Sequence, residues 1–156
     1  MKIINKLFLV LFIGVFGSEV LFANYAFYRQ VTSTCKSYHV EVSSSEMLFS
    51  ADDKNFAINL TSRRNNFEMI MLIGFAAAGK AIIHQKYLQG TISNYNPVIP
   101  DQVNVVVTVP MGRDNTIFSA EANAILVQEL ADGSLDSADF MRKIKIQFKH
   151  YKEVLC

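Results

Sequence analysis

One stretch of the sequence comes close to a phosphate-binding motif. Gly74, Gly79 and Lys80 match the spacing Gly-x-x-x-x-Gly-Lys, in which a glycine-rich loop surrounds phosphate groups. The next residue is Ala81, whereas nucleotide hydrolases carry a Ser or Thr there, whose hydroxyl holds a magnesium ion. Helix-start signals also precede the stretch, where a strand would be needed. We therefore expect a helix whose small residues allow close packing, and we predict no cofactor.

The three histidines are scattered along the chain, at His39, His84 and His150. They lack the H-x-x-x-H and H-E-x-x-H spacings of metal sites, and no Gly-x-Ser-x-Gly elbow marks a nucleophilic serine. The sequence therefore predicts no catalytic, cofactor-binding or metal-ligating residue. Folding can still bring remote residues together, and His39, His84 and Asp114 are the candidates for such an assembled site.

The only two cysteines, Cys35 and Cys156, lie near the two ends of the chain that follows residue 23. In an oxidising compartment an even pair predicts a disulfide. Such a bridge would enclose nearly the whole domain, and by the chain-entropy model it would stabilise the fold by about 4 to 5 kcal/mol. Two free thiols, or a bond to another chain, are the alternatives.

The first segment, residues 1–23, has the pattern of a signal peptide. Two lysines precede an apolar run from Leu7 to Phe16, which is about half the length needed to cross a bilayer. We expect export to the periplasm or secretion, with transient membrane contact through this leader only. An uncleaved anchor is the alternative, because Leu21 is bulky at a position that prefers a small residue.

Composition predicts that residues 24–156 form a single globular domain. The chain has 156 residues, of which 51% are hydrophobic and 19% charged, and this is too short for two ordinary domains after a leader. Its 15 basic and 14 acidic side chains give a net charge of +1. Such a balance creates no broad positive field, and we expect no nucleic-acid partner.

The longest predicted element is a helix over about residues 66–88. Asn65 can cap it, Glu68 places a carboxylate in its first turn, and Gly90 supplies a stop. The first half is apolar on nearly every side, which is typical of a helix buried between a sheet and another layer. Two shorter helices are predicted over about residues 122–131 and from Ser137 onward.

Alternating apolar residues predict the strands, with a hairpin turn at residues 52–55. Residues 24–36 show no clear period and are interpreted as a mobile arm or a first edge strand. Residues 103–109 are apolar on both faces and predict a central strand, whereas lysines on the last strand are typical of an edge. The predicted strands cover residues 38–43, 47–50, 56–61, 103–109, 116–122 and 144–149.

These elements predict an α+β (or mixed α/β) fold. We expect a mainly antiparallel sheet of about five to six strands, packed against one long buried helix and one or two shorter helices. With no reactive motif, we expect a non-catalytic exported protein, an interaction or structural module of a cell-envelope or extracellular assembly whose partner is another protein there. A small exported hydrolase, with a site assembled from distant residues, is the alternative. No oligomeric state is predicted.

We predict that the thiols of Cys35 and Cys156 are blocked in protein isolated from its native compartment, because an intramolecular disulfide consumes both. An alkylating reagent added under denaturing, non-reducing conditions should label neither residue, as read by mass spectrometry of the intact chain. After reduction the same reagent should label both. Labelling of both residues before reduction would contradict the disulfide.

Overall fold

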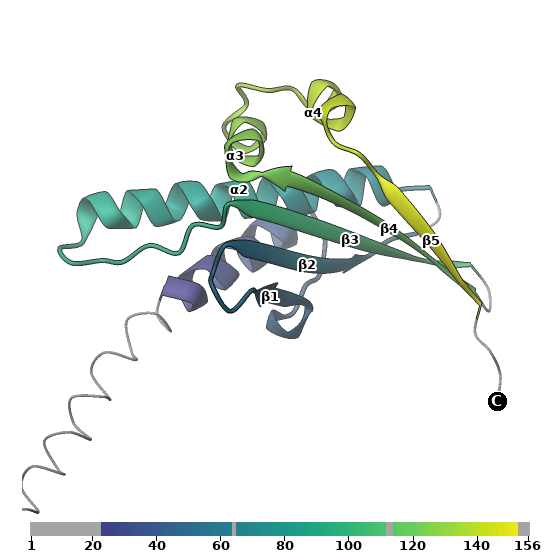
Figure 1. Ribbon diagram of the computed structural model, residues 1–156, viewed down its shortest axis with the longest axis horizontal. Coiled ribbons are helices and arrows are strands. Elements are labelled where there is room, and N and C mark those ends of the chain that lie inside the picture. Colours follow the sequence, from purple (N-terminus) through teal and green to yellow (C-terminus); the bar gives the residue numbers. More distant parts are fainter. Residues whose placement is uncertain (1–22, 64, 112–113, 153–156) are drawn as a thin grey trace, which may run out of the picture.

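A computed structural model describes residues 23–63, 65–111 and 114–152. Within these ranges the chain forms a five-stranded sheet whose spatial order follows the sequence (Figure 1). Three neighbouring pairs are antiparallel, and β2 and β3 run parallel because the α2 helix carries the chain back between them. The α+β prediction is confirmed, with a mixed sheet. The strands are β1 (Met47–Phe49), β2 (Asn55–Thr61), β3 (Gln102–Met111), β4 (Asp114–Asn123) and β5 (Gln147–Lys152).

Every second side chain of the inner strands faces the core. In β2, Phe56 and Ile58 are buried, and the register places them beside the buried Val103 and Val105 of β3. Residues of the other parity stay partly or fully exposed, as the alternation of side chains along a strand requires. The predicted hairpin and central strand are confirmed, but the described helices cover only one face of β3.

The α2 helix (Phe67–Thr91) runs along the covered face of the sheet (Figure 1). It begins after Asn66, carries Glu68 in its first turn, and continues one residue past Gly90. Half of its most apolar window is buried inside the fold, as expected for a core helix, although its length and hydropathy would also suit a membrane span. The stretch from Gly74 to Ala81 lies in mid-helix, which confirms the helical interpretation.

Two short helices pack along the flank of α2, beyond the β4 side of the sheet (Figure 1). The α3 helix (Ala124–Asp132) is capped by the Asn123 side chain and ends at Gly133, whose φ of 86° requires the left-handed region that glycine tolerates. The α4 helix (Ser137–Lys143) is capped by Asp136. Its Phe140 lies edge-on to Phe75 of α2, with ring centroids 5.1 Å apart. Both helices therefore hold the C-terminal third of the chain against α2.

Residues 23–37 form a helix, so the prediction of a mobile arm or edge strand there is wrong. Ala23, Phe27, Val31 and Cys35 are all 0% exposed and recur every four residues, which is the spacing of one helix face. The aromatic side chains obscured this period in the sequence. Phe27 packs edge-on against Phe49 and Phe56. The described chain thus has three shorter α-helices beside α2, rather than one or two, together with a short 3₁₀ helix, η1 (Ser44–Glu46).

Residues 38–43 do not form a strand, although their alternation of apolar and polar residues predicts one. Val40 and Val42 are buried as the pattern predicts, but no described strand pairs with this segment. The chain instead turns at His39, whose φ is 58°. The last strand also starts later than predicted, at Gln147, because Ile144 closes α4 by donating its N–H to the Phe140 carbonyl.

The contact between α2 and α3 leaves no room for a side chain at Gly79. A Cβ there would lie 2.3 Å from the Val127 carbonyl oxygen and 2.6 Å from the Ala131 Cβ. We predict that Gly79→Ala destabilises the protein by about 1 to 3 kcal/mol, because the helices must separate. Gly90→Ala is the matched control in the same helix, with nothing within 4 Å, and it should stabilise by about 0.5 kcal/mol.

Urea unfolding followed by circular dichroism measures both changes. Equal effects of the two substitutions would show that close packing at Gly79 does not contribute to stability.

Candidate functional site

The residues proposed for an assembled hydrolase site do not meet. The α2 helix begins near the end of β2 and runs back toward the start of β3, and His84 lies 17 residues after Phe67, about 25 Å along the axis. Asp114 opens β4, opposite Met111 at the end of β3, and therefore lies at the end of the sheet where α2 starts. The fold thus separates His84 from Asp114.

His39 lies in the turn that follows the helix of residues 23–37, and His150 lies in β5, where only its backbone is described. Within the described residues, no group of three or more His, Cys, Asp or Glu side chains could hold a metal ion. His84 lines a hollow of about 550 Å³ between that first helix and α2, but none of the described residues that line it is a carboxylate that could orient the imidazole as a catalytic base requires.

Cys35 is buried in the core, and burial raises the pKa of its thiol to about 11. The thiol is therefore neutral at physiological pH, and a buried neutral thiol is a poor nucleophile. Cys156 lies outside the described residues, so the pairing of Cys35 with Cys156 stays a prediction.

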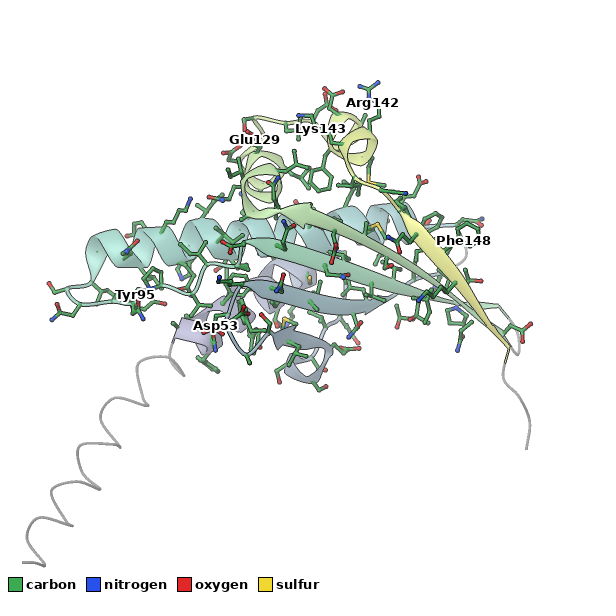
Figure 2. The ribbon with its side chains drawn as sticks, viewed as in Figure 1. Asp53, Tyr95, Glu129, Arg142, Lys143 and Phe148 are labelled. Atoms are coloured by element: carbon green, nitrogen blue, oxygen red, sulfur yellow. The ribbon has the colours of Figure 1, made fainter. Side chains whose placement is uncertain are left out.

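A buried glutamine joins three segments beside the His84 hollow. The Gln85 side chain donates to the Ala23 carbonyl at 2.9 Å, and its Oε1 accepts from the Tyr95 hydroxyl at 2.9 Å and the Val98 N–H at 3.1 Å. Both polar atoms of this amide, Nε2 and Oε1, make hydrogen bonds within the fold. We therefore infer that Gln85 attaches both the helix of residues 23–37 and the loop after α2 to the core. Tyr95 lies in that loop (Figure 2).

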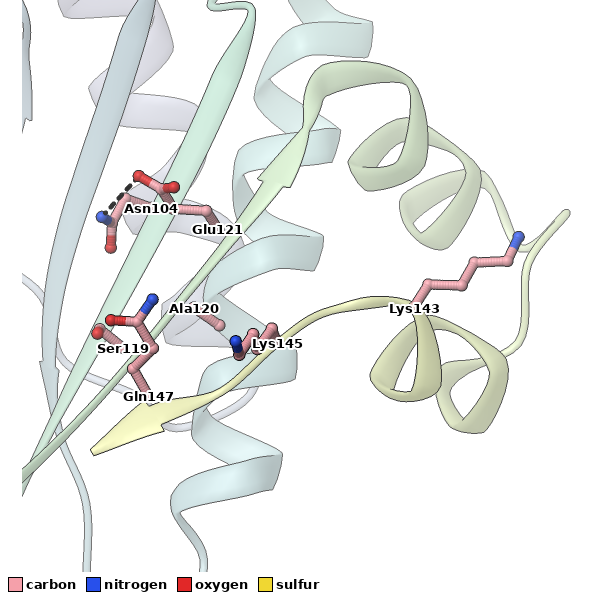
Figure 3. Close-up of a pocket in the computed structure, with 7 residues that line it drawn as sticks. All are labelled: Asn104, Ser119, Ala120, Glu121, Lys143, Lys145 and Gln147. Carbon is pink, nitrogen blue, oxygen red and sulfur yellow. Dashed lines mark hydrogen bonds between the residues drawn. The ribbon is translucent and has the colours of Figure 1, made fainter.

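A polar hollow lies where β4 and the chain entering β5 diverge. Its volume is about 420 Å³, and we call it the β4–β5 hollow (Figure 3). The Asn104 side chain donates to Glu121 Oε1 at 3.3 Å, while the Oδ1 atom of Asn104 is buried and has no hydrogen-bond partner among the described residues. The hollow is lined by Asn104, Ser119, Ala120, Glu121, Lys143, Lys145 and Gln147.

The hollow exists because β5 pairs with only part of β4. The ladder between them ends at Ser119 and Gln147, so no described strand lies beside the last residues of β4 on that side. The chain before Gln147 leaves the sheet because Ile144 is buried at the end of α4, which is itself held on α2. The position of α4 therefore opens the hollow.

A second accessible surface is the sheet face that no described helix covers, which we call the open face. Its side chains form rows across the strands, and the central Val106 and Ser119 are half-buried by their neighbours. Leu48 on β1 is 67% exposed. The rows of the open face are Leu48, Ala57, Asn104 and Glu121; Asn59, Val106, Ser119 and Gln147; and Thr61, Thr108, Ile117 and Lys149.

Sequence reasoning did not single out the polar residues of the β4–β5 hollow. The available signal was the polar Asn104 between Val103 and Val105, together with Lys145 beside the last strand. That signal marks the solvent side of a strand but not the place where two strands separate, because the separation depends on α4 packing.

We predict that Gln85→Leu destabilises the protein by about 3 kcal/mol, because the substitution leaves the Ala23 carbonyl and the Val98 N–H without partners inside the core. Tyr95→Phe is the milder control and should cost about 1 kcal/mol, since it removes one hydrogen bond and leaves Gln85 in place. Thermal unfolding measures both. A neutral Gln85→Leu would show that this amide does not hold the segments together.

No protein-family model matches the chain, and no curated protein and no solved structure is significantly similar to it. The function must therefore be argued from the open face, the strand edges and the β4–β5 hollow themselves.

Proposed function

We propose that this is a non-catalytic exported protein, an interaction or structural module of a cell-envelope or extracellular assembly that binds a partner protein through its open face. Export rests on the signal-peptide pattern of residues 1–23. The observation that carries the binding role is the one-sided layering: the helices of the described chain pack on one face of the sheet only (Figure 1).

The composition of the open face suits a protein partner. Its charged side chains, Glu121 and Lys149, lie on β4 and β5, while the part over β1 to β3 carries Leu48, Val106 and small or amide side chains. Protein interfaces have the same arrangement, with an uncharged centre and a polar rim. A flat surface of this kind offers wide contact area rather than a pocket for a small substrate.

The β5 edge of the sheet supports the same role. β1 and β5 are the first and last strands in the order, but the outward N–H of Phe49 on β1 already donates to the Tyr28 hydroxyl at 3.3 Å, whereas β5 has an edge without a described strand partner. Such an edge can accept an extended segment of another protein by main-chain hydrogen bonds. Figure 2 shows Phe148 on β5, at the border of the sheet, where an added strand would lie.

A pull-down with the full chain as bait, from the envelope and secreted fractions of cells that make it, tests this role. We predict that Val106→Arg lowers partner recovery at least about tenfold, because an arginine at the centre of the open face blocks contact. Ile125→Arg is the control: Ile125 is also aliphatic and 70% exposed, but it lies on α3 in the helical layer.

Both variants should unfold within about 5 °C of the unmodified chain, which excludes misfolding as the cause. Equal losses in the two variants would contradict binding through the open face. Recovery of no partner, together with turnover in a broad hydrolase screen, would contradict the non-catalytic role.

A further inference from the structure

We propose that the β4–β5 hollow binds the C-terminal end of an extended partner chain, with the partner's terminal carboxylate beside Lys145. This inference rests on the proposed function, since it names the part of a partner protein that the molecule would recognise. Three properties of the hollow carry it: strand backbone that no described strand pairs with, a closed end, and the cationic side chain of Lys145.

The unpaired backbone follows from the register. The Ala124 N–H donates to the Asp101 carbonyl at 3.0 Å, on the β3 side of the chain. Successive residues of a strand direct their backbone groups to alternate sides, so Ala122 also faces β3, whereas Glu121 and Asn123 face away from it. On that far side the β5 ladder has already ended at Ser119. The N–H groups of Glu121 and Asn123 and the Glu121 carbonyl therefore point to where an added strand would lie.

The hollow is closed at one end. Ser119 of β4 and Gln147 of β5 are paired, and they block any chain that would continue along the β4 edge. The unpaired stretch of β4, from Ala120 to Asn123, is about 13 Å long. Three to four extended residues fill such a length, and their chain must then stop. A segment that runs antiparallel to β4 ends with its carboxylate at this closed end.

The charges at the closed end match a carboxylate. Lys145 lines the hollow from the segment that leads into β5, on the side of Ser119 and Gln147, whereas Lys143 at the end of α4 points away from them (Figure 3). Glu121 is the one acidic side chain among the described lining residues, and it accepts a hydrogen bond from the Asn104 amide at 3.3 Å. The Gln147 side chain adds an amide donor beside Ser119. A lysine ammonium and an amide that converge on one place form charge-assisted hydrogen bonds with a carboxylate.

Two pools of N-acetylated random hexapeptides test the proposal, one with a free C-terminal carboxylate and one with a C-terminal amide. Each pool is passed over the immobilised full chain in detergent, and the retained peptide is measured by mass spectrometry. We expect retention of the free-acid pool to exceed that of the amide pool by about tenfold or more. Equal retention of both pools, or of neither, would overturn the proposal, because side-chain carboxylates are present in both.

Variants locate the binding. Lys145→Gln should lower retention of the free-acid pool by about tenfold, while Lys80→Gln, an exposed lysine on α2, should leave it unchanged. Glu121→Pro removes a backbone N–H that faces the hollow without removing a bond to β3. We expect this change to weaken retention about tenfold more than Glu121→Ala. A similar loss for the proline and alanine variants, with both still folded by circular dichroism, would exclude strand addition at β4.

The pull-down separates this inference from the proposed function. If the partner is lost with Val106→Arg but neither peptide pool is retained, the open face binds a partner and the C-terminal site is wrong. If the free-acid pool is retained in a Lys145-dependent way and Val106→Arg leaves partner recovery unchanged, the C-terminal site holds and binding through the open face is wrong.

Discussion

The close approach of α2 to its neighbours is the constraint on which the rest of the structure depends. On one side, a Cβ at Gly74 would lie 2.8 Å from Val105 Cγ1 of the central strand. On the other side, Gly79 touches the backbone of α3 at Val127. Small residues on both sides of one helix allow it to pack tightly against a sheet and a second helix at once. A larger residue at either glycine would force one of these layers away.

The position of α3 determines where the sheet ends. Because α3 must cross α2 at Gly79, the chain has to leave β4 at Asn123, whose side chain then caps the helix. The α4 helix follows after a short turn and docks Phe140 on Phe75 of the same α2 helix. The chain re-enters the sheet only at Gln147, opposite Ser119, so no described strand lies beside Ala120 to Asn123 on that side. The β4–β5 hollow is thus a geometric consequence of two helices that share one packing partner.

Elements with a strong local period could be predicted from the sequence. The apolar residues of β2 and β3 and the cap and charge signals of α2 lie within single short windows, so their type and approximate bounds were correct. The helix of residues 23–37 was not predicted because the exposed Tyr25 and the partly buried Tyr28 add aromatic residues beside the fully buried positions, which recur every four residues. The strand predicted over residues 38–43 is absent for a different reason. Val40 and Val42 are buried, as their alternation predicts, but alternate burial does not require the segment to pair with another strand.

The candidate sites could not be predicted in the same way, because each depends on which face or edge of a strand the rest of the described fold leaves uncovered. Asn104 and Gln147 look alike in the sequence, as polar positions that alternate with apolar residues on predicted strands. In the fold both line the β4–β5 hollow, where Asn104 has one buried amide atom without a partner among the described residues and Gln147 pairs at the end of the β5 ladder. The lysines around β5 show the same dependence on context. In the sequence they are typical of a strand at the edge of a sheet, and in the fold Lys145 forms the cationic end of a site for a chain terminus, at a closed gap between two strands.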